Sequence, residues 1–467
     1  MKTNTSACEV HTSLKTHEGA PAAKESAEKE LTRAISCCML WEDTFYEKGS
    51  ALAERIEELC SKVSLRFLCQ LAIRARTDLK LRHIPLWLCV QLLKQNSDRI
   101  HTAIESYSVA STINQVIQRA DELSELVSLY WKDGKKPLAS QLKKGLAAAF
   151  RKFNEYQLSK YNRDSRVKLR DVLFLCHAKP QNEEQDNLWK KLIAGELAVP
   201  DTWEVSLSTG ADKKETFTRL LIEKKLGYMA LLRNLRNMEE AGVDRDIIQT
   251  ALIEGAPNSK ALPFRFIAAA KVAPKLEAAL SEGVIASCKT LPKLFGRTLL
   301  VVDVSGSMQY NLSQKSAMSR VDAANGLAML IREQGEDVTI YATAGSDAAR
   351  QHDTAIVPAR HGFSLSDAIL EKMRNLGGGG IFLVQCMEYI SKQERRDNFD
   401  RVIVITDEQD CDIGVKASEA KKLATKNYII NVGTYEPALP VTGAGWTRIS
   451  GFSERVIDWI IAEESQQ

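Results

Sequence analysis

One carboxylate and two hydroxyls stand at alternate positions in the segment Asp303-Val-Ser305-Gly-Ser307, which we call the metal loop. The apolar run 299–302 before it has the length and β-branched content of a buried strand, and 321–331 after it has the periodicity of a helix. Oxygen atoms of this kind suit Mg²⁺ or Mn²⁺, which prefer hard oxygen ligands. A strand, an oxygen-rich loop and a helix in this order predict a metal site at the carboxyl end of a parallel sheet.

The metal loop resembles the metal-ion-dependent adhesion site of von Willebrand factor A domains, in which three loops hold the metal. The first loop is intact, and Asp407 after the apolar run 402–406 matches the third loop, where it would bind through water. The second loop should offer a threonine, but Ile381 follows the glycine run 377–380 and carries no ligand oxygen. Water can complete the octahedral shell of Mg²⁺ at lower affinity. The candidate ligands are Asp303, Ser305, Ser307 and Asp407, and both a weak metal site and an empty relic stay open.

Composition describes an ordinary globular protein. The chain has 467 residues, room for two or three domains, with 44% hydrophobic and 26% charged residues. Its net charge is only +3, so any affinity for nucleic acid must come from a local patch. The ten cysteines form no C-x-x-C pair and no zinc spacing, which predicts buried, reduced thiols in a cytoplasmic protein. No signal peptide and no apolar run of about 18 residues is present, so we expect no membrane contact.

The chain up to residue 292 is predicted to be helical, because apolar residues recur at i, i+3 and i+4 and strand-like alternation is nearly absent before Thr298. The predicted helices are 22–41, 51–75, 81–95, 111–130, 138–160, 186–194, 214–222, 225–238 and 244–254. Short turns with glycine or proline separate them, which predicts antiparallel pairs stacked as a HEAT-type solenoid. One irregular bundle is the alternative. Residues 1–18 are expected to be a flexible tail, and 19–292 a helical-repeat domain.

From residue 297 to 467 the pattern changes to a second, α/β domain. The predicted strands are 299–304, 338–342, 401–406 and 428–432, and the predicted helices are 319–334, 365–376, 384–392, 417–426 and 454–462. Strands separated by helices predict a doubly wound parallel sheet.

Positive charge is concentrated between residues 132 and 191, which hold fifteen Lys/Arg against seven Asp/Glu. A predicted helix-to-helix junction gathers five of these cations: Lys160, Arg163, Arg166, Lys168 and Arg170. Phosphate contact by such a group releases counterions and gives salt-dependent binding without base specificity. Tyr156, Tyr161 and His177 nearby offer surfaces on which unpaired bases could stack. The alternative is an ordinary solvated helix face.

Several segments, in this order, resemble the TROVE-domain proteins of the Ro ribonucleoprotein family. The segment Thr16-His-Glu-Gly-Ala-Pro-Ala22 is similar to the opening of bacterial members, and Leu158-Ser-Lys160-Tyr161 through Cys176-His177-Ala-Lys179-Pro180 resembles the K-Y … H-x-K-P stretch. The segment Ala230-Leu-Leu-Arg233-Asn234-Leu-Arg-Asn-Met238 resembles the L-L-R-N-L helix, and Leu262-Pro263-Phe264-Arg265 resembles the P-F helix start.

The resemblance implies a monomeric ring of HEAT-like repeats closed by the A domain. It implies that small non-coding Y-like RNAs bind a basic outer surface, and that single-stranded 3′ ends of misfolded RNAs enter the central hole. Bacterial relatives can partner an exoribonuclease through such an RNA. Asp164 stands where the family has an RNA-contacting arginine, and its neighbours could substitute. The candidate RNA-binding residues are Lys160, Arg163, Arg166, Lys168, Arg170, His177 and Lys179.

The sequence offers little support for catalysis. No Ser/His/Asp order, zinc set or P-loop stands out, so we expect no catalytic residues and no enzyme. The competing hypotheses are a protein-binding scaffold that uses the metal of the A domain, and an RNA-processing enzyme. Steep salt dependence with co-purifying RNA favours the ring, whereas protein binding that EDTA abolishes favours the scaffold.

Overall fold

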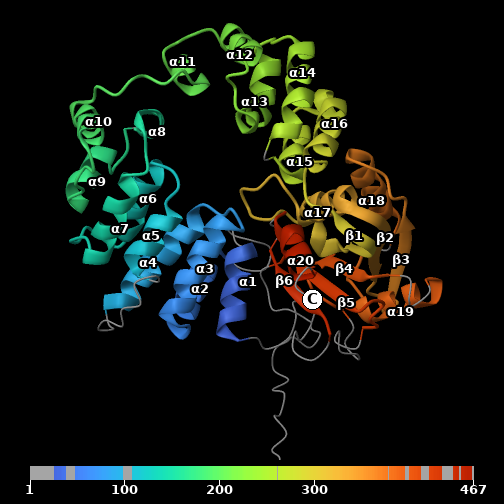
Figure 1. The fold of residues 1–467 in the computed structure, drawn as a ribbon. Helices are drawn as coiled ribbons and strands as arrows, with labels where there is room; N and C mark the ends of the chain where they lie inside the picture. The colour runs from blue at the N-terminus through green and yellow to red at the C-terminus, as the bar shows by residue number, and fades with distance from the viewer. Residues whose placement is uncertain are drawn as a thin grey trace, which may run out of the picture.

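The computed structural model describes residues 26–37, 48–97, 108–162, 164–259, 261–376, 378–394, 399–411, 420–433, 445–451 and 454–464. Within them a helical part precedes an α/β part, as predicted, and the change falls between Cys288 and Leu294 (Figure 1). The predicted tail 1–18 and the predicted RNA contact Arg163 lie outside the described residues. Among the described helices, none combines the length and the apolar character that crossing a bilayer requires. The cysteines predicted to be buried, Cys60, Cys69, Cys89 and Cys176, are buried free thiols.

The helical part is a succession of stacked helix pairs. Its described α-helices are α1 (Ala27–Cys37), α2 (Gly49–Lys62), α3 (Leu65–Thr77), α4 (His83–Ser97), α5 (Val109–Val116), α6 (Asp121–Tyr130), α7 (Ser140–Phe150), α8 (Glu155–Tyr161), α9 (Leu169–Cys176), α10 (Glu183–Ala194), α11 (Trp203–Ser208), α12 (Lys213–Ile222), α13 (Tyr228–Glu240), α14 (Arg245–Gly255), α15 (Pro263–Val272) and α16 (Glu277–Cys288). Helices pack on the next helix and the next but one: α3 on α4 and α5, α4 on α6, and α5 on α7. One apolar core runs through α1–α10 and a second through α12–α16. This succession is typical of a solenoid rather than of one bundle.

Three predictions of single long helices were wrong. The predicted helix 51–75 breaks before Ser64, whose side chain caps α3, and 138–160 breaks before Asn154, whose side chain caps α8. The predicted helix 111–130 is α5 and α6 with a short turn between them. Short polar caps end a helix without interrupting the apolar spacing, so periodicity alone runs through the break. Helices α9, α11, α15 and α16 were not among the predicted ranges.

The α/β part is a six-stranded sheet in the order β3-β2-β1-β4-β5-β6. Its described elements are β1 (Leu294–Asp303), α17 (Arg320–Gln334), β2 (Gly335–Ser346), β3 (Gln351–Val357), α18 (Phe363–Asn375), α19 (Leu383–Gln393), β4 (Arg401–Thr406), β5 (Lys426–Asn431), β6 (Thr447–Ser450) and α20 (Val456–Glu464), with the short 3₁₀ helix η4 (Gly306–Gln309). All pairings are parallel except that of β3 with β2. Leu300 and Val302 of β1 face one apolar core and Leu299 and Val301 face another, so helices cover both sides of the sheet.

Two features of the α/β part differ from the prediction. The predicted helix 417–426 is wrong in its described residues, because 420–425 are not helical and β5 begins at Lys426. Ala420 and Leu423 are buried against the sheet, which produces a helical spacing without a helix. Strands β3 and β6 were not predicted, and β3 is an edge strand whose residues are partly polar and exposed.

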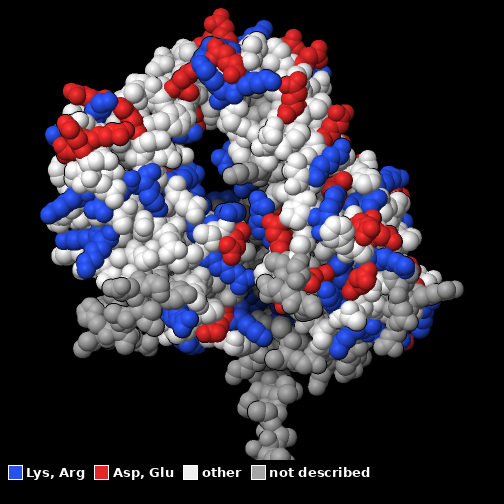
Figure 2. All heavy atoms as spheres, in the orientation of Figure 1, with Lys and Arg blue, Asp and Glu red and all other residues white. Residues whose placement is uncertain are grey.

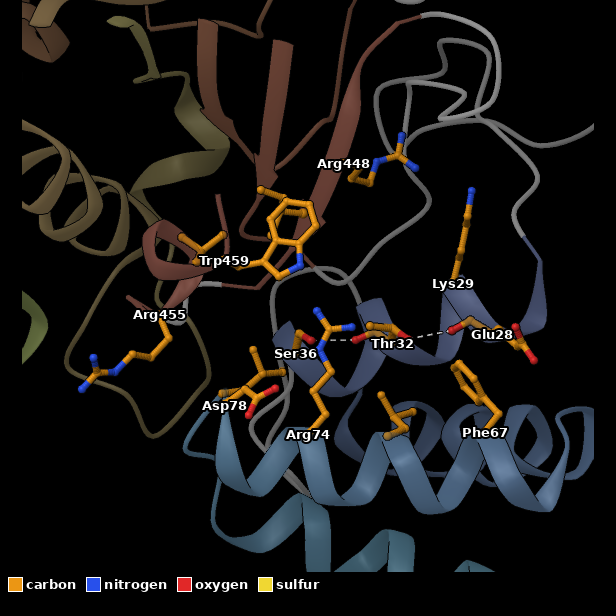
Figure 3. A pocket seen from close by; sticks show the side chains of 14 residues that line it. Glu28, Lys29, Thr32, Ser36, Phe67, Arg74, Asp78, Arg448, Arg455 and Trp459 are labelled. Atoms are coloured by element: carbon orange, nitrogen blue, oxygen red, sulfur yellow. Dashed lines mark hydrogen bonds between the residues drawn. The ribbon is translucent and has the colours of Figure 1, made fainter. Parts of the chain in front are cut away.

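The two ends of the described chain meet and close a ring (Figure 1). Helix α1 packs on β6, while α15 and α16 pack on α17. A Cβ at Gly451, where φ is +105°, would lie 2.7 Å from the Ser36 carbonyl oxygen, so glycine permits this close approach. A cavity of about 330 Å³ lies beside the closing contact, with Arg74 of α3 and Trp459 of α20 facing it (Figure 3). Figure 2 shows that the side chains leave an opening through the molecule between α8 and α13.

Candidate nucleic-acid interface and metal loop

The predicted RNA-binding residues that the structure describes lie on α8, on the loop after it and around α9. Lys160 is in the last turn of α8, Arg166 is on the loop, Lys168 and Arg170 begin α9, and His177 and Lys179 follow its last turn. We call these residues the α8–α9 surface. All of them are exposed or half-buried, and Figure 2 shows Lys and Arg gathered over this side of the molecule. Arg163 cannot be placed with them, because it lies outside the described residues.

The unexpected acid Asp164 neutralises one cation of this surface. Its carboxylate lies 2.9 Å from the Lys168 ammonium, and its own side chain is 91% exposed. The hydrogen bond and charge of Lys168 lower the pKa of Asp164. Arg170 lies 3.9 Å from Asp171, a weak pairing at an exposed position. The acid therefore partly offsets the charge of Lys168, while Arg166 is exposed on the same loop.

Aromatic rings stand beside Lys160. Its ammonium lies 5.8 Å from the centre of the Tyr156 ring and 5.9 Å from that of Tyr161. The Tyr156 side chain is 52% exposed, so a base could stack on it. The Arg119 guanidinium lies over the Tyr161 ring at 4.6 Å, and this contact joins α8 to the turn between α5 and α6. His177 ends α9 with a left-handed backbone, φ +52°, and its ring is exposed.

A second group of cations was not predicted. Arg82 precedes α4, Arg119 lies between α5 and α6, Arg233 is on α13 and Arg265 is on α15. The pKa of Arg233 is lowered, first by partial burial of a side chain that still reaches solvent and then by the charges of Arg265, Arg119 and Arg82. Cations from both helical cores are therefore close enough to repel one another. We call these four residues the arginine cluster, and Figure 2 shows Lys and Arg side chains bordering the opening.

A buried ion pair positions half of this cluster. The Arg76 guanidinium donates to the Glu122 carboxylate at 2.6 Å, and the Glu122 side chain is fully buried. Arg76 also donates to the carbonyl oxygen of Leu81, next to Arg82. The second Glu122 oxygen accepts the backbone amide of Arg119 at 3.1 Å. One charged pair thus holds both turns that carry Arg82 and Arg119.

The four arginines differ in how much charge they leave for a ligand. Arg82 lies 2.7 Å and Arg119 2.9 Å from the Asp121 carboxylate. Arg233 and Arg265 are exposed, and neither forms an ion pair within the described ranges. Both lie in segments that resemble the Ro family, and in each segment the arginine stands among apolar residues that are buried. A cation within an apolar segment is the one sequence signal that could have identified them.

In the metal loop, the structure brings together the predicted first-loop residues. The Asp303 carboxylate is buried and accepts the Thr406 hydroxyl at 2.6 Å and the Ser305 amide at 2.8 Å. The hydroxyl oxygens of Ser305 and Ser307 are 3.3 Å apart. Burial raises the pKa of Asp303 to about 7, and the neighbouring Asp407 adds to the rise. A cavity of about 530 Å³ lies against Ser307 and the glycines at 378–380.

The other two loops do not fit a divalent cation. Asp407 is fully buried, and its carboxylate accepts a hydrogen bond from the Arg320 guanidinium at 3.4 Å. Ile381 is 1% exposed and packs in the core of the sheet, so the second loop supplies no side-chain oxygen at this position. Within the described ranges, no group of three or more His, Cys, Asp or Glu side chains is placed to hold a metal. Of the two alternatives that the sequence leaves open, a weak Mg²⁺ or Mn²⁺ site and an empty relic, this donor set favours the second.

Comparisons with known proteins confirm the resemblance. The TROVE domain family matches residues 179–325, and the Ro60 vWA domain family matches residues 297–431. The mouse (Mus musculus) protein "Telomerase protein component 1" is 35% identical over 100 residues, which cover 20% of this chain and only 4% of that relative. The crystal structure of the RO (RSR) protein of Deinococcus radiodurans superposes with a TM-score of 0.57 at 16% identity, covering 94% of this chain and 99% of that one. This likeness supports the fold: a helical part followed by a von Willebrand factor A domain.

Proposed function

This chain is a TROVE-domain protein with a Ro60 von Willebrand factor A domain, and from these two domains we propose that it holds small structured RNAs and single-stranded RNA ends. TROVE and Ro proteins are RNA-binding components of ribonucleoproteins. More specifically, we propose that Y-like RNAs bind the α8–α9 surface and that 3′ ends of misfolded RNAs enter the opening. The observation that carries it is the pair of basic regions, joined where Arg119 lies over Tyr161.

The α8–α9 surface suits the backbone of a folded RNA. Its cations sit on a helix end and a loop, and they can reach phosphates without reading base edges. Tyr156 offers an exposed ring for an unpaired base beside the ammonium of Lys160. These features support binding by shape and charge, as expected for a small structured RNA.

The opening suits a single strand. The arginine cluster concentrates positive charge between the two helical cores, and a phosphate entering there would relieve the repulsion among these cations. A single strand is narrow and flexible, whereas a duplex is wide and stiff. We therefore assign the 3′ end to the opening and the folded body of the RNA to the outer surface. An exoribonuclease can be joined to the ring through a Y-like RNA, as the family resemblance implies.

Fluorescence anisotropy tests the proposal with a hairpin RNA that either ends blunt or carries a single-stranded 3′ tail. We expect both RNAs to bind with affinity that falls as salt rises, and the tailed hairpin to bind more tightly. EDTA should leave both affinities unchanged. A tail that adds nothing contradicts the use of the opening. Salt-insensitive binding contradicts the phosphate contacts.

The competing scaffold hypothesis makes the opposite forecast. A protein partner that binds through the metal of the A domain would be released by EDTA and spared by nuclease. Sequencing the RNA that co-purifies with the chain identifies the ligand. Purification free of RNA, together with EDTA-sensitive protein capture, would replace the RNA proposal with the scaffold.

A further inference from the structure

We infer that the three loops of this A domain are held together without a divalent metal, and that the Arg320 guanidinium supplies the positive charge in its place. The inference is independent of the RNA proposal, because it concerns only the α/β part. It decides between the two alternatives that the sequence leaves open, a weak metal site and a relic of one.

Arg320 joins the first loop to the third. It is the first residue of α17, and its backbone amide donates to the Tyr310 carbonyl oxygen at 3.0 Å. Its guanidinium donates to the Ser307 carbonyl oxygen at 2.8 Å and to the Asp407 carboxylate at 3.4 Å. The side chains of Arg320 and Asp407 are 3% and 0% exposed. A carboxylate that would bind a metal through water is instead paired with a fixed cation of the protein.

This placement opposes a divalent ion for an electrostatic reason. Two like charges held a few ångströms apart away from water repel strongly, and the guanidinium cannot lose its proton to relieve the repulsion. The charge of Asp407 is already balanced by Arg320, so the attraction that would desolvate Mg²⁺ is reduced as well. A metal that used Asp407 would have to compete with the buried Arg320 guanidinium for that carboxylate.

Backbone contacts connect the second loop to the first loop and to the third. The Gly306 amide donates to the Gly379 carbonyl oxygen at 3.0 Å, and the Cys411 amide donates to the Ile381 carbonyl oxygen at 2.8 Å. A Cβ at Gly380 would lie 1.9 Å from the Cys411 sulfur, so the space beside the second loop is filled. The Thr406 hydroxyl bonded to Asp303 joins the ends of β1 and β4. Groups of the protein therefore make each link that a shared metal would otherwise provide.

The first test measures metal binding to the intact protein. Isothermal titration with Mn²⁺ and thermal unfolding with Mg²⁺, Mn²⁺ or EDTA should show no saturable heat and no shift in melting temperature at about 1 mM metal. Saturable Mn²⁺ binding that Asp303→Asn abolishes would overturn the inference.

The second test restores the metal site. Arg320→Gln combined with Ile381→Thr removes the cation and returns the hydroxyl, so Mn²⁺ should raise the melting temperature of this double variant by several degrees. Ile381→Thr alone should gain much less, because Arg320 is still paired with Asp407. The matched control is Arg332→Gln with Ile381→Thr, which removes a cation from the same helix at a half-buried position away from the loop.

Each outcome of the second test decides the question. Equal Mn²⁺ binding by Ile381→Thr and by the Arg320 double variant would show that Arg320 does not exclude the metal. A folded double variant whose melting temperature does not rise with Mn²⁺ would show that the loops cannot form a metal site. That result would contradict the inference that Arg320 takes the place of a metal ion. If the double variant does not fold alone, refolding with and without Mn²⁺ gives the same readout, since Mn²⁺ should then restore folding.

Discussion

Replacing Arg233 and Arg265 together by alanine should weaken the binding of single-stranded RNA ends and make it less sensitive to salt. Both side chains are exposed and form no ion pair within the described ranges, so each can neutralise a phosphate. Each phosphate contact to a single strand contributes about 0.7 to the slope of log affinity against log salt, so the double variant should lose about 1.4. Between about 50 mM and about 200 mM salt, wild-type affinity should then fall about 7-fold more than that of the variant.

The assay compares the blunt and the tailed hairpin over this salt range by fluorescence anisotropy. The double variant should lose the contribution of the tail and keep the binding of the blunt hairpin. The matched control is Arg219→Ala with Arg236→Ala on α12 and α13, because these arginines already face acids: Arg219 lies 2.9 Å from Asp201, and Arg236 lies 3.8 Å from Glu240. The control removes the same net charge and should leave the slope for the tail unchanged.

Three results would refute the role of the arginine cluster. The slope for the tail could be unchanged in the double variant, which would mean that neither arginine contacts phosphate. The blunt and tailed hairpins could lose affinity equally, which would show a general loss of charge. The control variant could lose as much of the salt slope for the tail as the double variant, which would also show a general loss of charge. Unfolding in urea checks that the variant is intact, since exposed positions of this kind usually change stability by less than about 0.5 kcal/mol.

Three further predictions concern the outer surface, the buried pair and pH. Lys160→Ala with Arg166→Ala should reduce the salt slope for the blunt hairpin by about 1 to 2 and leave the added affinity of the tail; an unchanged slope places the hairpin elsewhere. Glu122→Gln should destabilise the protein by about 3 kcal/mol in urea unfolding, because Arg76 keeps a buried charge without its partner, and a loss under about 1 kcal/mol would mean that the pair is solvated. Burial raises the pKa of Glu454 to about 8 from an ordinary 4.5, so the folded state binds the extra proton. The stability gained from that proton is complete below about pH 4.5 and is lost as pH rises towards 8. The melting temperature of Glu454→Gln should therefore depend less on pH than that of the wild type. An unchanged dependence on pH would assign the effect to another group.

The framework of the α/β part follows from the sequence because buried parallel strands are continuous apolar runs. Strand β4 has the predicted bounds, and the predicted helix 319–334 is α17 to within one residue. Strand β3 escaped prediction because an edge strand needs apolar residues on one face only, and its first half is polar. The predicted helix 417–426 failed where Ala420 and Leu423 meet the sheet from a non-helical segment.

The sites were predicted only where their residues are neighbours in the chain. The α8–α9 surface is one segment, so its composition reveals it. The arginine cluster brings together residues as far apart in the sequence as Arg82 and Arg265. No local sequence pattern shows that such distant residues are close in the folded ring. The metal loop was identified from its oxygen-bearing side chains. Arg320 was not identified, because it lies 87 positions from its partner Asp407 in the sequence and is itself not a ligand oxygen.

Closure of the ring and the charge of the opening are coupled at the start of α15. The Phe264 amide donates to the Glu454 carboxyl group at 2.7 Å, which ties α15 to the segment before α20. The next residue, Arg265, belongs to the arginine cluster, and its charge lowers the pKa of Glu454 against the larger effect of burial. A protonated Glu454 leaves the charge of Arg265 for phosphate, whereas an ionised Glu454 competes with phosphate for it. This contact between α15 and the α/β part therefore also influences how much positive charge Arg265 presents at the opening, because Arg265 directly follows Phe264 in the chain.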